Sequence, residues 1–141
     1  MRRSGIAMWR EHPWPGVGPG GVKREYRNYA QAEALTKRTG HLHNSALQIL
    51  VETGVAGLLA WLWLWAAFYT EAVRLFRRLP PAAIRERALV AGSIAAITGF
   101  LVAGMSEHNF GDSEVVILAW MIMALPFTVR GARTGGKPET P

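Results

Sequence analysis

Two histidines and an asparagine stand immediately before a strongly apolar run. His41, His43 and Asn44 belong to "GHLHNSALQILVETGVAGLLAWLWLW", which covers residues 40–65. Imidazole accepts and donates protons near neutral pH, so a histidine at a membrane surface suits general acid–base catalysis. Asn44 and Ser45 can instead serve to cap the helix that follows them. The residue types alone leave both interpretations open, a general base and a histidine that only caps or packs.

Histidines at i and i+2 also raise the question of a metal site. A catalytic zinc usually takes three protein ligands, and the third would have to be His108 or a distant acid. The chain has no cysteine, which excludes a thiolate metal site, a disulfide and a cysteine nucleophile. Because this ligand set is incomplete, we expect no metal and no other cofactor.

The region before the histidines is polar, basic and rich in glycine. Residues 12–22, "HPWPGVGPGGV", contain four glycines and three prolines, a composition that predicts turns with special backbone angles. No Lys-Ser/Thr pair follows these glycines and no apolar strand precedes them, so a nucleotide-binding loop is not expected. The next segment, "VKREYRNYAQAEALTKR", predicts a helix with cations that can meet a phosphate, a lipid headgroup or water.

Three apolar segments, at about residues 55–76, 88–105 and 115–129, are candidates for crossing a bilayer. A helix needs about 20 residues to do so. The first carries Glu71 with Arg74 three residues later, a pair expected to lie at headgroup level. The second contains the small-residue pairs Gly92/Ala96 and Ala95/Gly99, which predict close packing against another helix. The third is short and contains Pro126, so it either crosses with tilt or is partly re-entrant.

The charges of the connecting segments predict the orientation. Five arginines and one glutamate lie within residues 74–87, at and after the end of the first apolar segment, whereas "SEHNFGDSE", between the second and third, has three acids and no lysine or arginine. The positive-inside rule therefore places the first connection in the cytoplasm and the second outside. His41, His43 and His108 are then expected on the same outer face. The formal net charge is +6, but the basic residues form no stripe with interleaved aromatics, so nucleic-acid binding is not expected.

We therefore predict an all-α, polytopic membrane protein in which about three transmembrane helices follow an extracytoplasmic, partly helical loop region. The predicted parts are a periplasmic loop region with the His-Asn motif (1–53), a region of three transmembrane helices (54–129) and a cytoplasmic tail (130–141). The three helices cover about 55–76, 88–105 and 115–129. A cytoplasmic loop (77–87) joins the first two helices, and a periplasmic turn (106–114) joins the second to the third. No signal peptide is evident before the basic outer region. We expect that the chain is the carboxy-terminal piece of a larger protein whose earlier membrane segments are missing.

A longer spacing pattern points to a family. "HNSALQILVETGVAG" has a His-Asn pair, nine residues, Gly54 and, three residues on, Gly57. With a membrane helix directly after it, this pattern resembles the signature of the bacterial O-antigen ligase and polymerase superfamily. "PWPGVGPGGVKREY", with Gly16 and Gly18, resembles the turn that opens the family's large periplasmic loop region, and "EHNFGDSEV" resembles its last periplasmic turn.

The resemblance implies a glycosyltransferase of the bacterial inner membrane with its His-Asn region on the periplasmic side. Members pass a glycan from undecaprenyl diphosphate to an acceptor, which is the lipid A core in ligases and a second lipid-linked repeat in polymerases. The family histidine falls on His43, which would activate or orient the acceptor hydroxyl, with Asn44, His41 and His108 as supporting residues. The candidates for holding the diphosphate are Arg24, Arg27 and Arg38.

Three alternatives stay open at this point. The chain can belong to an O-antigen or exopolysaccharide polymerase, to a protein O-oligosaccharyltransferase, or be a truncated membrane fragment that catalyses nothing. Three membrane segments do not readily enclose a polyprenyl diphosphate and an acceptor, so we expect this chain alone to be inactive. Its expected partners are the lipid-linked donor, the glycan acceptor, membrane lipids and the missing amino-terminal segments.

Overall fold

The computed structural model of the chain describes residues 2–29 and 41–134. Its elements in chain order are α1 (Arg2–Glu11), α2 (Gly21–Tyr29), α3 (Ser45–Arg78), α4 (Ile84–Ala103), the 3-10 helix η1 (Asn109–Gly111) and α5 (Ser113–Thr134). No strand occurs within the described ranges, and the all-α prediction is confirmed.

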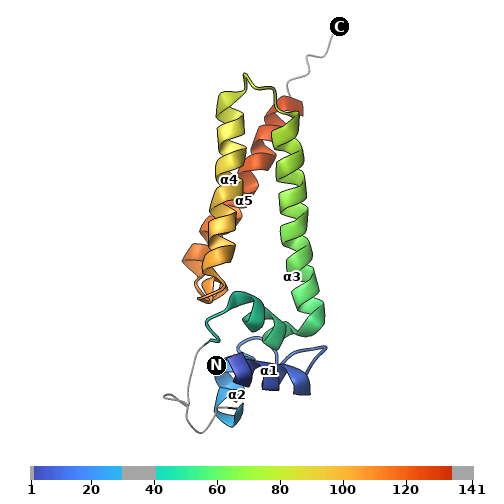
Figure 1. Cartoon of the computed structure of the whole chain (residues 1–141), viewed down its shortest axis with the longest axis vertical. Helices are drawn as coiled ribbons and strands as arrows, with labels where there is room; N and C mark the ends of the chain where they lie inside the picture. Colours follow the sequence, from blue (N-terminus) through green and yellow to red (C-terminus); the bar gives the residue numbers. More distant parts are fainter. Residues whose placement is uncertain (1, 30–40, 135–141) are drawn as a thin grey trace.

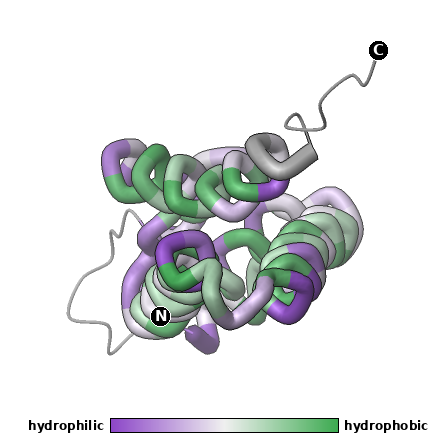
Figure 2. Tube along the Cα trace, turned by 90° about the horizontal axis from the view of Figure 1, so that it is seen from above, coloured by the Kyte–Doolittle hydropathy of each residue, from purple (hydrophilic) through white to green (hydrophobic). Residues whose placement is uncertain are grey.

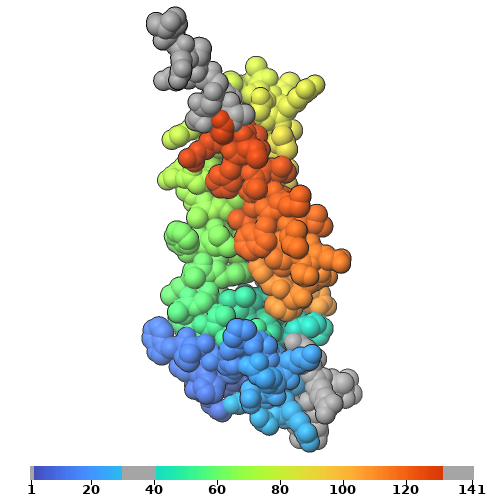
Figure 3. All heavy atoms as spheres, turned by 180° about the vertical axis from the view of Figure 1, so that it is seen from behind, coloured from blue at the N-terminus to red at the C-terminus, as the bar shows by residue number. Residues whose placement is uncertain are grey.

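Three long helices form a bundle, and the amino-terminal helices lie across one end of it. α3, α4 and α5 stand side by side, while α1 and α2 form a layer beneath them (Figure 1). The same layer closes the lower end of the molecule when it is seen from behind (Figure 3). The start of α3, residues 45–53, lies in this layer, and we call α1, α2 and residues 45–53 together the surface layer.

The bundle has the length and surface of a membrane-spanning structure. Ser45–Arg78, Ile84–Ala103 and Ser113–Gly131 are each long and apolar enough to cross a bilayer. Large apolar side chains also face outward, among them Trp63, Val102 and Met121, which are 72%, 60% and 63% exposed. Figure 2 looks along the bundle and shows hydrophobic positions recurring along its helices. An apolar surface of this extent requires a lipid environment.

Aromatic side chains hold the three helices together in the half of the bundle nearest the surface layer. Trp65 of α3 is buried and stacks on Trp120 of α5, with ring centroids 6.0 Å apart and planes 2° from parallel. Its ring also meets Phe100 of α4 and Phe110 of η1 at 6.2 and 6.0 Å. Such contacts add to the burial of large apolar surfaces.

At the opposite end, one arginine closes the turn between α3 and α4. Arg87 donates to the carbonyl oxygens of Phe76 (3.2 Å) and Leu79 (2.9 Å), the last of which caps α3. Its guanidinium also lies 4.1 Å from the centre of the Phe76 ring, a cation–π contact. The carbonyl groups at the end of α3 therefore have donors, and the two helices form a fixed hairpin.

The small-residue face of α4 packs against no described helix. A Cβ atom added at Gly92 or Gly99 would meet nothing within 4 Å, and the buried side of α4 is formed by Val90, Ser93 and Ile97. The expectation of close helix packing at this face is therefore not met within the described part of the chain. The third apolar segment, by contrast, forms one continuous helix through Pro126, which is long and apolar enough to cross a membrane and contains no re-entrant turn.

Gly54 divides α3 into two parts. Its backbone angles, φ 68° and ψ −168°, are not helical, so residues 45–53 form a short helix in the surface layer and Val55 starts the membrane helix. The layer has its own apolar core, in which Met8, Val22, Tyr26, Leu42 and Val51 are buried together. This core fixes α1 and α2 against the segment that carries the His-Asn pair.

Candidate functional site

The turn rich in glycine and proline between α1 and α2, residues 12–20, is called the glycine-proline turn. It supplies hydrogen-bond donors to the end of the short helix 45–53, where α3 is broken at Gly54. A helix that ends leaves its last carbonyl groups without intrahelical donors. The amide of Val17 donates to the carbonyl of Val51, and the amide of Gly18 donates to that of Glu52, both at 2.9 Å. The turn therefore acts as a backbone cap for the end of the short helix.

The same turn also approaches the membrane helix so closely that only glycine fits at the break. The amide of Val55 donates to the carbonyl of Pro13 at 3.0 Å. A Cβ atom at Gly54 would lie 1.9 Å from the carbonyl oxygen of Trp14, and one at Gly16, which has φ 67°, would lie 2.4 Å from the backbone of Glu52. Both glycines combine a positive φ with contact against backbone, which excludes any side chain.

Gly57, the last residue of the spacing pattern, makes room for a side chain one turn earlier. A Cβ atom here would lie 1.9 Å from Oγ1 of Thr53. That hydroxyl donates to the carbonyl of Ile49 at 2.6 Å, so the threonine bridges the end of the short helix. Each conspicuous glycine of the pattern therefore has a steric reason within this fold.

Asn44 caps the short helix and ties it to the turn after α4. Its Oδ1 accepts from the amide of Leu47 at 2.8 Å, and its Nδ2 donates to the carbonyl of Met105 at 2.9 Å. Ser45 adds two more bonds to the same turn, from its amide to the carbonyl of Gly104 (2.7 Å) and from its hydroxyl to the carbonyl of Glu107 (3.1 Å). Three hydrogen bonds from Asn44 and Ser45 therefore dock the turn after α4 on the start of the short helix.

His43 stands directly before this cap in an unusual backbone conformation. Its φ is 51°, in the left-handed region that residues other than glycine rarely occupy. Nδ1 of its ring lies 3.0 Å from Oε2 of Glu107. When Nδ1 carries the proton, it donates to the carboxylate and Nε2 keeps its lone pair. The side chains are 43% and 61% exposed, so a substrate can reach them.

The other two histidines lie beside this pair. The ring of His41 is 4.3 Å from that of His43 and 6.0 Å from that of His108, measured between centroids. His108 is half-buried, and its Nδ1 has no hydrogen-bond partner among the described residues. Burial, and then the positive charge of protonated His41, lower the pKa of His108, which therefore favours the neutral form. The structure thus brings together all three histidines named from the sequence.

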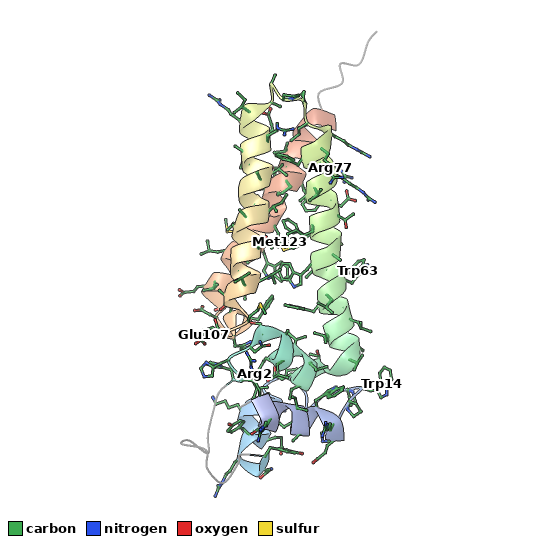
Figure 4. All side chains as sticks on the ribbon, viewed as in Figure 1. Arg2, Trp14, Trp63, Arg77, Glu107 and Met123 are labelled. Carbon is green, nitrogen blue, oxygen red and sulfur yellow. The ribbon has the colours of Figure 1, made fainter. Side chains whose placement is uncertain are left out.

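Glu107 is the residue that the sequence analysis missed. It lies 64 positions after His43, and Figure 4 shows it where the turn after α4 meets the surface layer. Its neighbour His108 was already a candidate, and an acid next to a candidate histidine in an outer turn is the signal that could have identified it. The donor atoms of His41, His43 and Glu107 lie within 4.8 Å of one another. These residues could hold a divalent metal ion, with Glu107 in place of the third ligand considered from the sequence.

Two of the three predicted diphosphate ligands, Arg24 and Arg27, are not part of this cluster. Arg24 donates from Nη1 to the carbonyl of Pro19 at 3.0 Å and so folds back over its own turn. Arg27 is exposed on α2, and Arg38 lies outside the described residues. Within the described ranges, no hydrogen bond or ion pair joins Arg24 or Arg27 to the histidines.

The protein is an all-helical, multi-pass membrane protein, and a histidine–carboxylate pair lies at one end of its helical bundle. The sequence model of the O-antigen ligase family matches residues 1–62. The match includes α1, the glycine-proline turn, α2, the His-Asn pair and both glycines of the spacing pattern, and the resemblance inferred from that pattern is thereby confirmed for these residues. A comparison with curated proteins found no match.

Proposed function

We propose that this chain takes part in transferring a glycan from undecaprenyl diphosphate to an acceptor, with His43 as the general base and Glu107 as its orienting partner. The observation that carries the proposal is the 3.0 Å contact between Nδ1 of His43 and Oε2 of Glu107. The match of residues 1–62 to the O-antigen ligase family supports the reaction class.

The pair suits removal of a proton from a hydroxyl group. A carboxylate that accepts from Nδ1 fixes the ring and its tautomer, and it stabilises the imidazolium that forms. Nε2 of His43 then takes the proton of the acceptor hydroxyl, whose oxygen bonds to the anomeric carbon of the donor sugar. The bond from that carbon to the diphosphate oxygen breaks, and undecaprenyl diphosphate leaves with the electron pair.

The surrounding structure supports a rigid base at a membrane surface. Asn44 caps the short helix next to His43, and the turn carrying Glu107 is docked on the same helix end. Groups held in this way need little reorganisation during the reaction. The charge distribution of the connecting segments favours placing this end in the periplasm of a bacterial inner membrane.

Arg24, Arg27 and Arg38 remain the proposed cations for the diphosphate. The leaving group carries negative charge, and guanidinium groups can bind phosphate oxygens in a bidentate manner. Arg27 is exposed on α2, so an anion can reach it. Arg24 would have to give up its bond to the carbonyl of Pro19.

The test is glycan transfer in membranes that contain the full-length protein, with a labelled undecaprenyl-diphosphate donor, because we expect this chain alone to be inactive. We expect His43→Ala to lower the rate by about 10²- to 10⁴-fold, the usual contribution of a general base. Glu107→Gln should lower it about 10- to 100-fold, as for groups that orient a functional imidazole. Glu114→Gln is the matched control, because Glu114 is an exposed acid of the same outer connection outside the pair. Immunoblots verify equal protein amounts.

The outcomes separate the alternatives. Transfer to lipid A core but not to a second lipid-linked repeat supports a ligase, and the reverse supports a polymerase. Unchanged transfer in His43→Ala defeats the catalytic assignment. Equal rates of transfer in Glu107→Gln and Glu114→Gln would show that the contact between His43 and Glu107 does not contribute to transfer. If the wild-type full-length protein transfers nothing to either acceptor, the result supports the non-catalytic membrane protein considered as the alternative.

A further inference from the structure

A second charged site lies at the opposite end of the bundle from the histidines. There a pocket of about 190 Å³ opens between α3 and α5. Three arginines line it, Arg74 and Arg78 from α3 and Arg130 from α5, together with the single acid Glu71. We call these four residues with the pocket they line the arginine pocket.

Glu71 organises two of the arginines and leaves the pocket positively charged. Its Oε1 accepts from Arg74 at 2.9 Å, the ion pair predicted from the sequence, and its Oε2 accepts from Arg130 at 3.4 Å. Arg78 forms no ion pair within the described structure. One carboxylate therefore faces three guanidinium groups. The paired side chains are 41–63% exposed, so an incoming anion can reach them.

The rest of the lining is apolar. Leu75, Pro126 and Phe127 complete the wall, and Phe127 is 45% exposed beside the pocket. A small anion would gain nothing from an apolar wall, whereas a lipid offers a phosphate to the arginines and an acyl chain to the apolar residues. Basic pockets between membrane helices are known to suit anionic headgroups, and arginine matches phosphate geometry.

We propose that the arginine pocket binds one anionic phospholipid. The phosphodiester lies among Arg74, Arg78 and Arg130, and the first part of an acyl chain covers Leu75 and Phe127. The proposal concerns the end of the bundle away from the histidines and does not depend on glycan transfer.

The experiment measures lipid retention by native mass spectrometry of the full chain in a non-ionic detergent, titrated with phosphatidylglycerol or phosphatidylcholine of the same acyl chains. We expect the protein to retain one phosphatidylglycerol and to bind phosphatidylcholine much more weakly. Arg78→Ala should weaken retention about fivefold, the effect of one cation at a membrane surface. Glu71→Gln should tighten it, because the competing carboxylate charge is removed.

Arg77→Ala is the matched control. Arg77 is adjacent to Arg78 on α3 and equally charged, but it does not line the pocket, and Figure 4 shows it extending away from the bundle. Its substitution should leave phosphatidylglycerol binding unchanged. Circular dichroism checks the helical content of each variant, and Arg78→Gln replaces Arg78→Ala if the alanine variant does not fold.

Three results would overturn the proposal. Equal retention of the two lipids would show that the pocket does not select a charged headgroup. A loss in Arg77→Ala as large as that in Arg78→Ala would show general attraction to the basic end. Displacement of phosphatidylglycerol by an equal concentration of inorganic phosphate would make the pocket a site for free anions.

Discussion

Replacing Gly54 by alanine tests the reasoning about the broken helix most directly. The new methyl group would overlap the carbonyl oxygen of Trp14, and the residue would keep a positive φ. A left-handed conformation costs a residue with a Cβ about 1–2 kcal/mol. Three backbone hydrogen bonds depend on the close approach, and each contributes about 0.5–1.5 kcal/mol. The local stability of the surface layer should therefore fall by about 3–6 kcal/mol.

The assay is amide hydrogen exchange followed by mass spectrometry. The amides of Val17, Gly18 and Val55 make the three bonds, and a loss of 3 kcal/mol corresponds to about 100-fold faster exchange when exchange requires opening. Gly92→Ala is the control, because it makes the same change in a membrane helix where a Cβ meets nothing within 4 Å. Exchange in Gly54→Ala that matches exchange in Gly92→Ala would refute the proposed role of the break.

Three further outcomes are expected. Asn44→Ala removes the cap on Leu47 and the bond to Met105, so thermal unfolding should show a loss of about 1–3 kcal/mol, while Asn44→Asp keeps the acceptor and should lose less. The pKa of His108 is lowered in the fold by its burial and by His41, so its contribution to stability is present above the ordinary histidine value of about 6.5 and is lost as the pH falls below that value. The protection factor of the amides in the turn after α4, which is the intrinsic exchange rate divided by the observed rate at the same pH, should therefore fall on acidification in the wild type and much less in His108→Gln. Chelation of divalent metals should leave glycan transfer unchanged, because the carboxylate of the pair already accepts from imidazole; a loss that zinc restores would instead establish a metal site.

The apolar composition was sufficient to predict the membrane helices. Long uncharged runs can cross a bilayer only as helices, since every backbone polar group must be bonded internally. The two glycines after the His-Asn pair permit backbone angles that a helix does not have, and the structure places a bend at Gly54. Local sequence was informative here because helix formation and glycine conformations are local properties.

The spacing of residue types did not predict the contacts between segments that are far apart in the sequence. α1 has a polar composition, and its buried residues, Ser4, Gly5 and Met8, acquire a partner only once the start of α3 lies against it. Glu107 meets His43 across 64 positions, a distance at which spacing carries no signal. Arg24 was one candidate for holding the diphosphate, and its hydrogen bond to the carbonyl of Pro19 depends on the fold of the turn, which residue spacing did not predict.

The location of the histidine–glutamate pair also constrains how the protein is made. His43 precedes α3 and Glu107 follows α4, so the chain crosses the bilayer twice between them and returns to the face it left. If either helix failed to insert, the two side chains would be separated by the full thickness of the membrane. The pair can form only after the translocation machinery has inserted the whole α3–α4 hairpin, and correct topology is therefore a precondition for any chemistry at this site.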